Sequence, residues 1–443
     1  MKLQKIYLEN FKCFNNIEIE FGKITLLTGA NSSGKSSIIY GILAALQSDE
    51  FPFQFSPNGL YVEMGDFQKI SKDHNKKNII KINLKSDDKD SLEINTSWAF
   101  DRLSKLPLLN ELFITSNYFN LRITRKLDDK LFIKYEPLKE DVNIEEIDKI
   151  TFEILKLLEN ASTLKDNNDI IYNDFKEKFL KRNIFEFSVD NITEINKHIQ
   201  SNFYLLNDFN KIKTFFTEIK KEINYISSFR LYPERNYYEK TDSNLKIGKS
   251  GEKYIDQILQ WETNKSKKFN EMIKILKKLE LLDNIRANRI QGGLFDILIK
   301  TKKNKTFSSL ADVGFGVSQI LPIIVADLQL ESNSTLIISQ PEIHLHPCAQ
   351  ASFATYIINQ LKNKNKNYII ETHSEYLLNR IRNEIVKDEV KSEDIKAYYL
   401  QNNGTNVIKN ELSFSKSGEI LNAPDDFFKT YMLDVMEIAL NAE

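Results

Sequence analysis

The sequence is constrained most by a glycine-rich stretch near its N-terminus, G-A-N-S-S-G-K-S-S over residues 29–37. The stretch fills every fixed position of the phosphate-binding pattern G-x-x-x-x-G-K-[ST]. An apolar run over 23–28 predicts a buried strand before it, and apolar residues at helical spacing predict a helix after it. This order places backbone N–H groups and the helix N-terminus against a polyphosphate. A chance match in a Gly/Ser-rich turn is the alternative, and the correct flanks argue against it.

The residue types of this loop indicate how a nucleotide would be held. We expect Lys35 to contact the β- and γ-phosphates and the Ser36 hydroxyl to ligate Mg²⁺. ATP and Mg²⁺ are therefore the expected cofactors. The other expected contacts from the loop are Gly29, Asn31, Ser32, Ser33, Gly34 and Ser37.

Composition narrows the class of protein. The 443 residues carry 61 Lys and Arg against 62 Asp and Glu, so no global basic field favours non-specific binding to nucleic acid. Cys13 and Cys348 are too few for a disulfide framework or a zinc site, which fits a reducing compartment. No apolar run approaches the ~20 residues that span a bilayer. We therefore expect a cytoplasmic protein with no membrane partner.

The pattern of apolar residues suggests four regions. Alternating segments predict a β-rich lobe over residues 1–102, and helical spacing around Ile147 and Leu158 predicts a helical insertion over 103–222. Further helices of the insertion are expected over 174–180, 191–206 and 212–219. A second half of the nucleotide-binding core is placed at 223–384 and contains a hairpin of 295–300 with 306–310. A hairpin of 394–400 with 405–408 and a helix over 426–440 follow in the last region, 385–443. The expected fold class is α/β, with a mixed β lobe and a parallel-sheet core.

A second set of motifs lies in the third region. Residues 312–319, D-V-G-F-G-V-S-Q, place a glycine turn and a serine at the start of a predicted helix. The apolar residues 335–338 predict a strand of a buried parallel sheet, which runs into S-Q-P-E-I-H-L-H-P over 339–347. Another apolar strand at 368–370 ends in E-T-H-S.

With the phosphate loop at the N-terminus, these motifs resemble the ABC-type ATPase heads of the RecF/SMC and overcoming-lysogenization-defect (OLD) class, in a bacterial branch. The resemblance implies a P-loop head with a RecA-like core, in which two heads sandwich ATP and the chain is its own partner. Carried over by residue, it implies that Gly316 and Ser318 contact the γ-phosphate on the partner head. It also implies that His373 contacts the γ-phosphate and that Lys12 lies beside the nucleotide, with an ordinary surface lysine as the alternative.

The chain departs from that class at the end of the strand over 335–338. Two acids normally stand there, one that orders Mg²⁺ and one that polarises the attacking water. Ser339 and Gln340 occupy these positions, and glutamine cannot accept a proton from water. Glu342 is the nearest carboxylate, and whether it can substitute is left open by Pro341. Gln340, Glu342 and His373 are thus the candidate catalytic residues of an ATPase whose hydrolysis is expected to be slow or absent.

Other candidate sites are set aside. His344 and His346 lack a third ligand for zinc, and Gln68 reads as a turn residue rather than a Mg²⁺-sensing glutamine. OLD nucleases continue into a metal-binding domain after the histidine. Here the acids that follow are too few for two-metal chemistry. They are Glu389, Glu393 and Asp394.

The leading hypothesis is an ATP-gated dimerising head that acts as sensor or scaffold for a separately encoded effector, such as a nuclease, in prokaryotic antiphage defence or genome maintenance. DNA is a possible partner. The alternative is an active DNA-repair motor of the RecF/SMC type, against which the missing acids and the absence of long heptad repeats count. A transporter subunit is disfavoured by the form of the glycine-serine motif and by the insertion.

Overall fold

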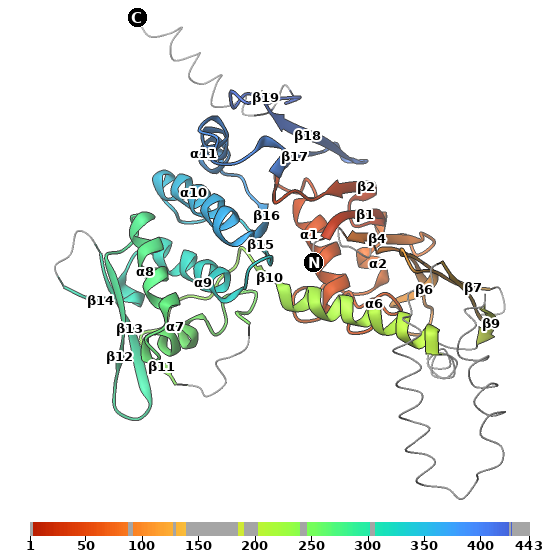
Figure 1. The fold of residues 1–443 in the computed structure, drawn as a ribbon, viewed down its shortest axis with the longest axis horizontal. Coiled ribbons are helices and arrows are strands. Elements are labelled where there is room, and N and C mark those ends of the chain that lie inside the picture. The colour runs from red at the N-terminus through yellow and green to blue at the C-terminus, as the bar shows by residue number, and fades with distance from the viewer. Residues whose placement is uncertain are drawn as a thin grey trace, which may run out of the picture.

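The computed structural model describes residues 3–86, 92–126, 130–138, 185–189, 203–239, 246–301, 306–424 and 427. Three sheets organise these residues (Figure 1). The helices predicted around Ile147, over 174–180, over most of 191–206 and over 426–440 lie outside the described residues. The boundaries of the four predicted regions stay a prediction, although the content of the second region differs from expectation.

An antiparallel sheet forms the lobe at the N-terminus. Its strand order is β2-β1-β4-β5-β6-β7-β8-β9 in the described part of the chain. The strands are β1 (Leu3–Phe11), β2 (Phe14–Glu20), β4 (Ile80–Ser86), β5 (Glu93–Phe100), β6 (Pro107–Thr115), β7 (Phe119–Arg125), β8 (Leu131–Pro137) and β9 (Phe185–Val189). Between β2 and β4 the chain forms β3, α1 and two short elements, α2 (Phe67–Ile70) and the 3₁₀ turn η1 (Lys72–His74).

The expectation of a helical insertion from residue 103 onward is wrong for residues 107–115, 119–125, 131–137 and 185–189. These residues form β6, β7, β8 and β9 and extend the antiparallel sheet. The sequence does alternate here with the period of two that is typical of a strand, since apolar Leu121 and Ile123 flank Arg122. In the structure the two apolar side chains are buried and Arg122 is exposed. Residues 212–219, predicted as helix, do lie in helix α6 (Phe203–Glu222).

The second sheet has a parallel core, in the order β10-β15-β16-β3-β17, with β18 and β19 added antiparallel at one edge. Side chains on the two faces of these strands belong to two different hydrophobic cores, so both faces of the sheet are buried. The strands are β3 (Ile24–Gly29), β10 (Ile223–Ile226), β15 (Thr335–Ser339), β16 (Asn367–Glu371), β17 (Ile395–Asn402), β18 (Val407–Phe414) and β19 (Ile420–Leu421).

Helices cover the parallel sheet on both sides. Helix α1 (Lys35–Gln47) and part of α6 pack with the antiparallel lobe in one core. The other core contains side chains of the remaining helices, which gather on the left of Figure 1. They are α7 (Tyr254–Thr263), α8 (Lys267–Lys278), α9 (Phe315–Gln329), α10 (Pro347–Lys364) and α11 (Glu375–Val386). The 3₁₀ turns η2 (Leu310–Asp312) and η3 (Ser392–Asp394) precede α9 and β17.

A small antiparallel sheet packs beside α7 and α8. It consists of β11 (Tyr237–Tyr238), β12 (Asn284–Arg289), β13 (Leu294–Lys300) and β14 (Ser308–Ser309). The pairing of β13 with β14 confirms the predicted hairpin. None of the helices within the described ranges is long and apolar enough to cross a bilayer.

Candidate functional site

The phosphate loop connects β3 to α1 at the carboxyl edge of the parallel sheet. Glycine is required at both ends of the loop. Gly29 has a φ of 136°, and a Cβ there would lie 2.2 Å from the carbonyl oxygen of Leu400. Gly34 has a φ of 99°, and a Cβ there would lie 2.9 Å from the sulfur of Cys13 and from the ring of Phe14. The loop can therefore pack against both β17 and the antiparallel lobe only without side chains at these positions.

The Lys35 ammonium lies within the loop that carries it. Its Nζ donates to the carbonyl oxygens of Gly29 and Ala30 at 3.0 and 2.7 Å and to Ser33 Oγ at 3.4 Å. Burial lowers the pKa of Lys35 from its ordinary value, and the carboxylates of Glu371 and Glu342 act in the opposite direction. The loop therefore holds a cation at the position where the motif requires one.

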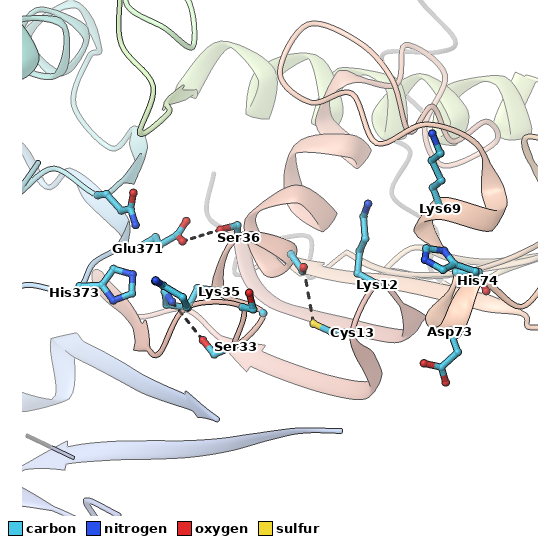
Figure 2. A pocket seen from close by; sticks show the side chains of 16 residues that line it. Lys12, Cys13, Ser33, Lys35, Ser36, Lys69, Asp73, His74, Glu371 and His373 are labelled. Carbon is cyan, nitrogen blue, oxygen red and sulfur yellow. Dashed lines mark hydrogen bonds between the residues drawn. The ribbon is translucent and has the colours of Figure 1, made fainter. Parts of the chain in front are cut away.

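The loop forms one wall of a cavity of about 610 Å³, a size in the range of small-molecule sites (Figure 2). Of the expected loop contacts, Gly29 alone is not among the lining residues. The lining consists of Asn31, Ser32, Ser33, Gly34, Lys35, Ser36, Ser37, Lys12, Cys13, Lys69, Ser71, Asp73, His74, Gln340, Glu371 and His373. Lysines at both ends give the cavity a positive character that suits a polyphosphate.

The antiparallel lobe supplies the end of the cavity away from Glu371. Lys12, at the β1–β2 turn, lines this end together with Lys69 and His74 (Figure 2). Burial lowers the pKa of the Lys12 ammonium, and the nearby Lys69 charge adds to the effect. Lys12 thus lines the cavity and Gln68 does not, while the contact of Lys12 with a nucleotide stays a prediction.

Glu371, a residue to which the sequence motifs assign no role, lies at the phosphate end of this cavity. Its Oε1 accepts a hydrogen bond from Ser36 Oγ at 2.7 Å, and its Oε2 accepts one from Ser339 Oγ at 3.1 Å (Figure 2 draws the first). The side chain is 5% exposed. A signal was available in the sequence, since a charged residue ends an otherwise apolar parallel strand two positions before His373.

The two positions that usually carry acids lie close to Glu371. Ser339 ends β15 and is buried, while Gln340 has a φ of 48° and lines the cavity. The backbone N–H of Gln340 donates to the carbonyl oxygen of Glu371 at 2.7 Å, and the Arg230 guanidinium donates to the carbonyl oxygens of Ser339 and Gln340 at 2.8 and 2.9 Å. These bonds hold the backbone at the end of β15, where neither Ser339 nor Gln340 carries a charge.

Glu342 does not line the cavity. Its carboxylate accepts hydrogen bonds from Thr372 Oγ1 at 2.8 Å and from the backbone N–H of His373 at 2.7 Å. Burial raises the pKa of the Glu342 carboxyl, while these two bonds and the charge of Arg230 work the other way. Glu342 therefore holds the turn that presents His373, and its position in the structure does not favour it as a substitute base.

His373 is exposed and lines the cavity beside Lys35 (Figure 2). Partial burial of the ring, and then the neighbouring Lys35 ammonium, lower the pKa of His373 from its ordinary value. A lowered pKa favours the neutral imidazole, in which one ring N–H can donate to a phosphate oxygen.

The glycine-serine motif opens α9, but Ser318 does not face outward. Its side chain is 1% exposed, and its Oγ donates to the carbonyl oxygen of Phe315 at 2.9 Å. The Ser318 hydroxyl is thus engaged within the first turn of α9, and its contact with a second molecule stays a prediction. Asp312, Gly314 and Phe315 are the exposed residues of the motif, and Gly316 is half-buried against His344.

The two histidines that follow β15 have contacts of other kinds. The His344 ring lies 5.8 Å from the ring of Phe315, and His346 Nδ1 accepts from the backbone N–H of Cys348 at 3.3 Å, capping α10. Within the described ranges, no group of three or more His, Cys, Asp or Glu side chains could hold a metal ion. For Mg²⁺, the Ser36 hydroxyl and the Glu371 carboxylate offer the hard oxygen atoms that this ion prefers.

Comparisons with known proteins agree with a nucleotide-binding chain. The family described as "AAA ATPase domain" matches residues 1–378. Structural maintenance of chromosomes protein 6A of Arabidopsis thaliana is 49% identical over 45 residues, which is 10% of this chain and 4% of the plant protein.

Two solved structures give weaker likenesses. The SMC head domain from Thermotoga maritima has a TM-score of 0.39 at 12% identity, covering 92% of this chain and 99% of that chain. The Smc head domain from Pyrococcus furiosus, with an extended coiled coil and bound to the C-terminal domain of ScpA, has a TM-score of 0.43 at 14% identity, covering 99% of each chain.

Proposed function

The chain belongs to the AAA ATPase domain family, and from this premise we propose that it is an ATP-gated dimerising switch that controls a separate effector protein. The observation that carries the proposal is a complete phosphate loop facing a strand end without an acid. Ser339 and Gln340 stand at that strand end, and neither can accept a proton from water. Such a site favours holding ATP over turning it over.

ATP binding is assigned to the phosphate end of the cavity. Lys35 contacts the β- and γ-phosphates, the N-terminus of α1 faces the same groups, and His373 donates to a γ-phosphate oxygen. Ser36 and Glu371 supply the oxygen atoms that would hold Mg²⁺. When bound, this ion neutralises charge on the phosphates. Lys12 and Lys69 contact the nucleotide at the other end of the cavity.

Slow hydrolysis follows from the groups around Gln340. A glutamine amide can orient a water molecule but cannot take its proton. Glu342 is engaged by Thr372 and His373, so it is not free to act in place of Gln340. Positioning and electrostatic stabilisation remain in the site, whereas general-base catalysis does not.

Dimerisation is supported by the surface around the start of α9. Gly314 and Phe315 are exposed there, and the Phe315 ring contacts the His344 ring on the loop that follows β15. The start of α9 therefore lies near the carboxyl edge of the parallel sheet, the edge that also carries the phosphate loop. The Tyr232 ring, 74% exposed, lies 5.4 Å from Phe315 and extends an aromatic surface. A second copy of the chain could bury this surface while the α9 N-terminus faces its ATP.

We expect Gly314→Glu to weaken ATP-dependent association at least about tenfold, because a carboxylate at the start of α9 would face the phosphates of the partner. Gly314 has an ordinary negative φ and open space around its Cβ position, so the variant should fold. Gly314→Ala is the matched control without charge. Sedimentation velocity with Mg²⁺ and ATP measures the effect. Equal dimer formation by Gly314→Glu and Gly314→Ala would place the interface elsewhere.

The class resemblance favours a role in prokaryotic antiphage defence or genome maintenance, with an effector such as a nuclease supplied by another protein. The alternative is a DNA-repair motor, in which DNA drives hydrolysis. Measuring ATP turnover and ATP occupancy with plasmid, linear DNA and RNA separates the two. The switch predicts slow turnover that DNA leaves unchanged and no cleavage of the nucleic acids. Turnover that rises many-fold with DNA would support the motor.

A further inference from the structure

We propose that Glu371 supplies the acid that the end of β15 lacks, by acting as the carboxylate partner of the Mg²⁺ ion that accompanies ATP. The carboxylate would then stand at the end of β16 instead of at the end of the neighbouring strand β15. This inference rests on the proposed binding of ATP and Mg²⁺, and it assigns a residue outside the expected strand.

The register of the sheet allows this exchange. β15 and β16 are parallel neighbours, and Ser339 is the register partner of Glu371. Their side chains therefore leave the sheet on the same side and meet, with Ser339 Oγ donating to Glu371 Oε2 at 3.1 Å. A carboxylate on either residue would therefore leave the sheet on the same side, next to the other residue.

The other neighbour of β16 carries the phosphate loop. β16 pairs with β3, and Glu371 is in register with Leu27, just before the loop begins. The Glu371 carboxylate consequently reaches Ser36, whose Oγ donates to Oε1 at 2.7 Å. Ser36 is the residue that the loop motif assigns to Mg²⁺, so Glu371 already contacts the side chain that would hold the ion.

The bonding of Glu371 leaves room for a cation. An ionised carboxylate offers about four acceptor sites, and two hydroxyl groups donate to this one. In the described part of the chain, no cationic side chain forms an ion pair with it. A carboxylate that is 5% exposed without such a pair is costly to bury. A divalent cation bound by Ser36 would offset that cost.

Other described carboxylates near the cavity do not fit this role. Glu342 is engaged by Thr372 and His373 and does not line the cavity. Asp73 lines the cavity from the antiparallel lobe, beside His74 and away from the phosphate loop (Figure 2). Glu371 is the carboxylate at the phosphate end.

The test compares ATP affinity in Mg²⁺ with ATP affinity in EDTA, by calorimetry on the full chain. Glu371→Gln keeps the shape of the side chain and removes the charge. We expect it to lower the gain in affinity that Mg²⁺ provides by about tenfold while leaving the affinity in EDTA unchanged. Glu375→Gln, four residues later at the start of α11 and outside the cavity lining, is the control and should behave as the parent chain.

The double variant Ser339→Asp with Glu371→Gln again has one carboxylate in this pair of residues, but carries it on β15 instead of β16. It should recover the Mg²⁺ dependence, and bound Mn²⁺ should be detected by its paramagnetic resonance spectrum in the parent and double variant. Equal losses of affinity in Mg²⁺ and EDTA, without recovery in the double variant, would reduce Glu371 to a structural role and overturn the inference. If the parent chain binds no ATP, the proposed function itself fails. If the parent shows a Mg²⁺ gain that Glu371→Gln leaves intact, only this inference fails.

Discussion

Replacing Lys35 with alanine is expected to lower the affinity for ATP by at least about 100-fold, because the phosphates lose two charge-assisted hydrogen bonds of roughly 1.5–3 kcal/mol each. The ammonium is buried in the loop, where its Nζ lies 2.7 Å from the carbonyl oxygen of Ala30. Among the described lysines that line the cavity, it alone comes from the phosphate loop, since Lys12 and Lys69 lie toward the other end. Calorimetric titration with ATP measures the loss.

The control for this experiment is Lys23→Ala. Lys23 precedes β3, pairs with Asp394 at 3.0 Å and does not line the cavity. Lys23→Ala also removes one positive charge near β3, but it leaves the cavity intact, so the ATP affinity of this variant should match that of the parent chain. Thermal unfolding of both variants reports any loss of folding. Unchanged affinity in folded Lys35→Ala would show that the phosphates bind elsewhere.

Gln340→Glu is expected to raise the steady-state rate of ATP hydrolysis by about 100-fold, because general-base catalysis contributes at least that much where the base is well placed. Gln340 lines the cavity beside Glu371 and His373, so a carboxylate there would face the γ-phosphate end. Its positive φ is tolerated by glutamine and should be tolerated equally by glutamate. The measurement is phosphate release under saturating ATP.

Two further variants bear on this prediction. Adding Ser339→Asp restores both customary acids, and pairing it with Glu371→Gln avoids two carboxylates in register. Glu342→Gln tests the alternative base. Fast hydrolysis by the parent chain that disappears in Glu342→Gln would show that the catalytic acid lies at Glu342, despite its bonds to Thr372 and His373.

The sequence predicted the parts of the molecule that are encoded locally. The phosphate loop requires nine consecutive residues and two flanking elements, and its glycines have the positive φ values that the motif implies. The pairings predicted for the hairpins of 295–300 with 306–310 and of 394–400 with 405–408 are also confirmed, as are the parallel strands that carry the second set of motifs. Each of these rests on spacing within a short window.

The rest depends on which segments meet in space. Glu371 contacts Ser36, 335 residues earlier, and this pairing follows from strand order rather than from any local pattern. Ser318 is 1% exposed at the start of α9, a burial that its motif does not indicate. Strand β7 was assigned to a helical region although Leu121 and Ile123 alternate with polar residues, because the helical spacing further along was extended too far back.

Size-exclusion chromatography after incubation with Mg²⁺ and ATP, with quantification of the nucleotide in each peak, detects an ATP-held dimer. We expect a dimer peak that retains intact ATP at about one molecule per protomer, and a Lys35→Ala sample that elutes without nucleotide. The same oligomer with and without ATP, or a peak that contains only ADP from rapid turnover, would rule out an ATP-held dimer.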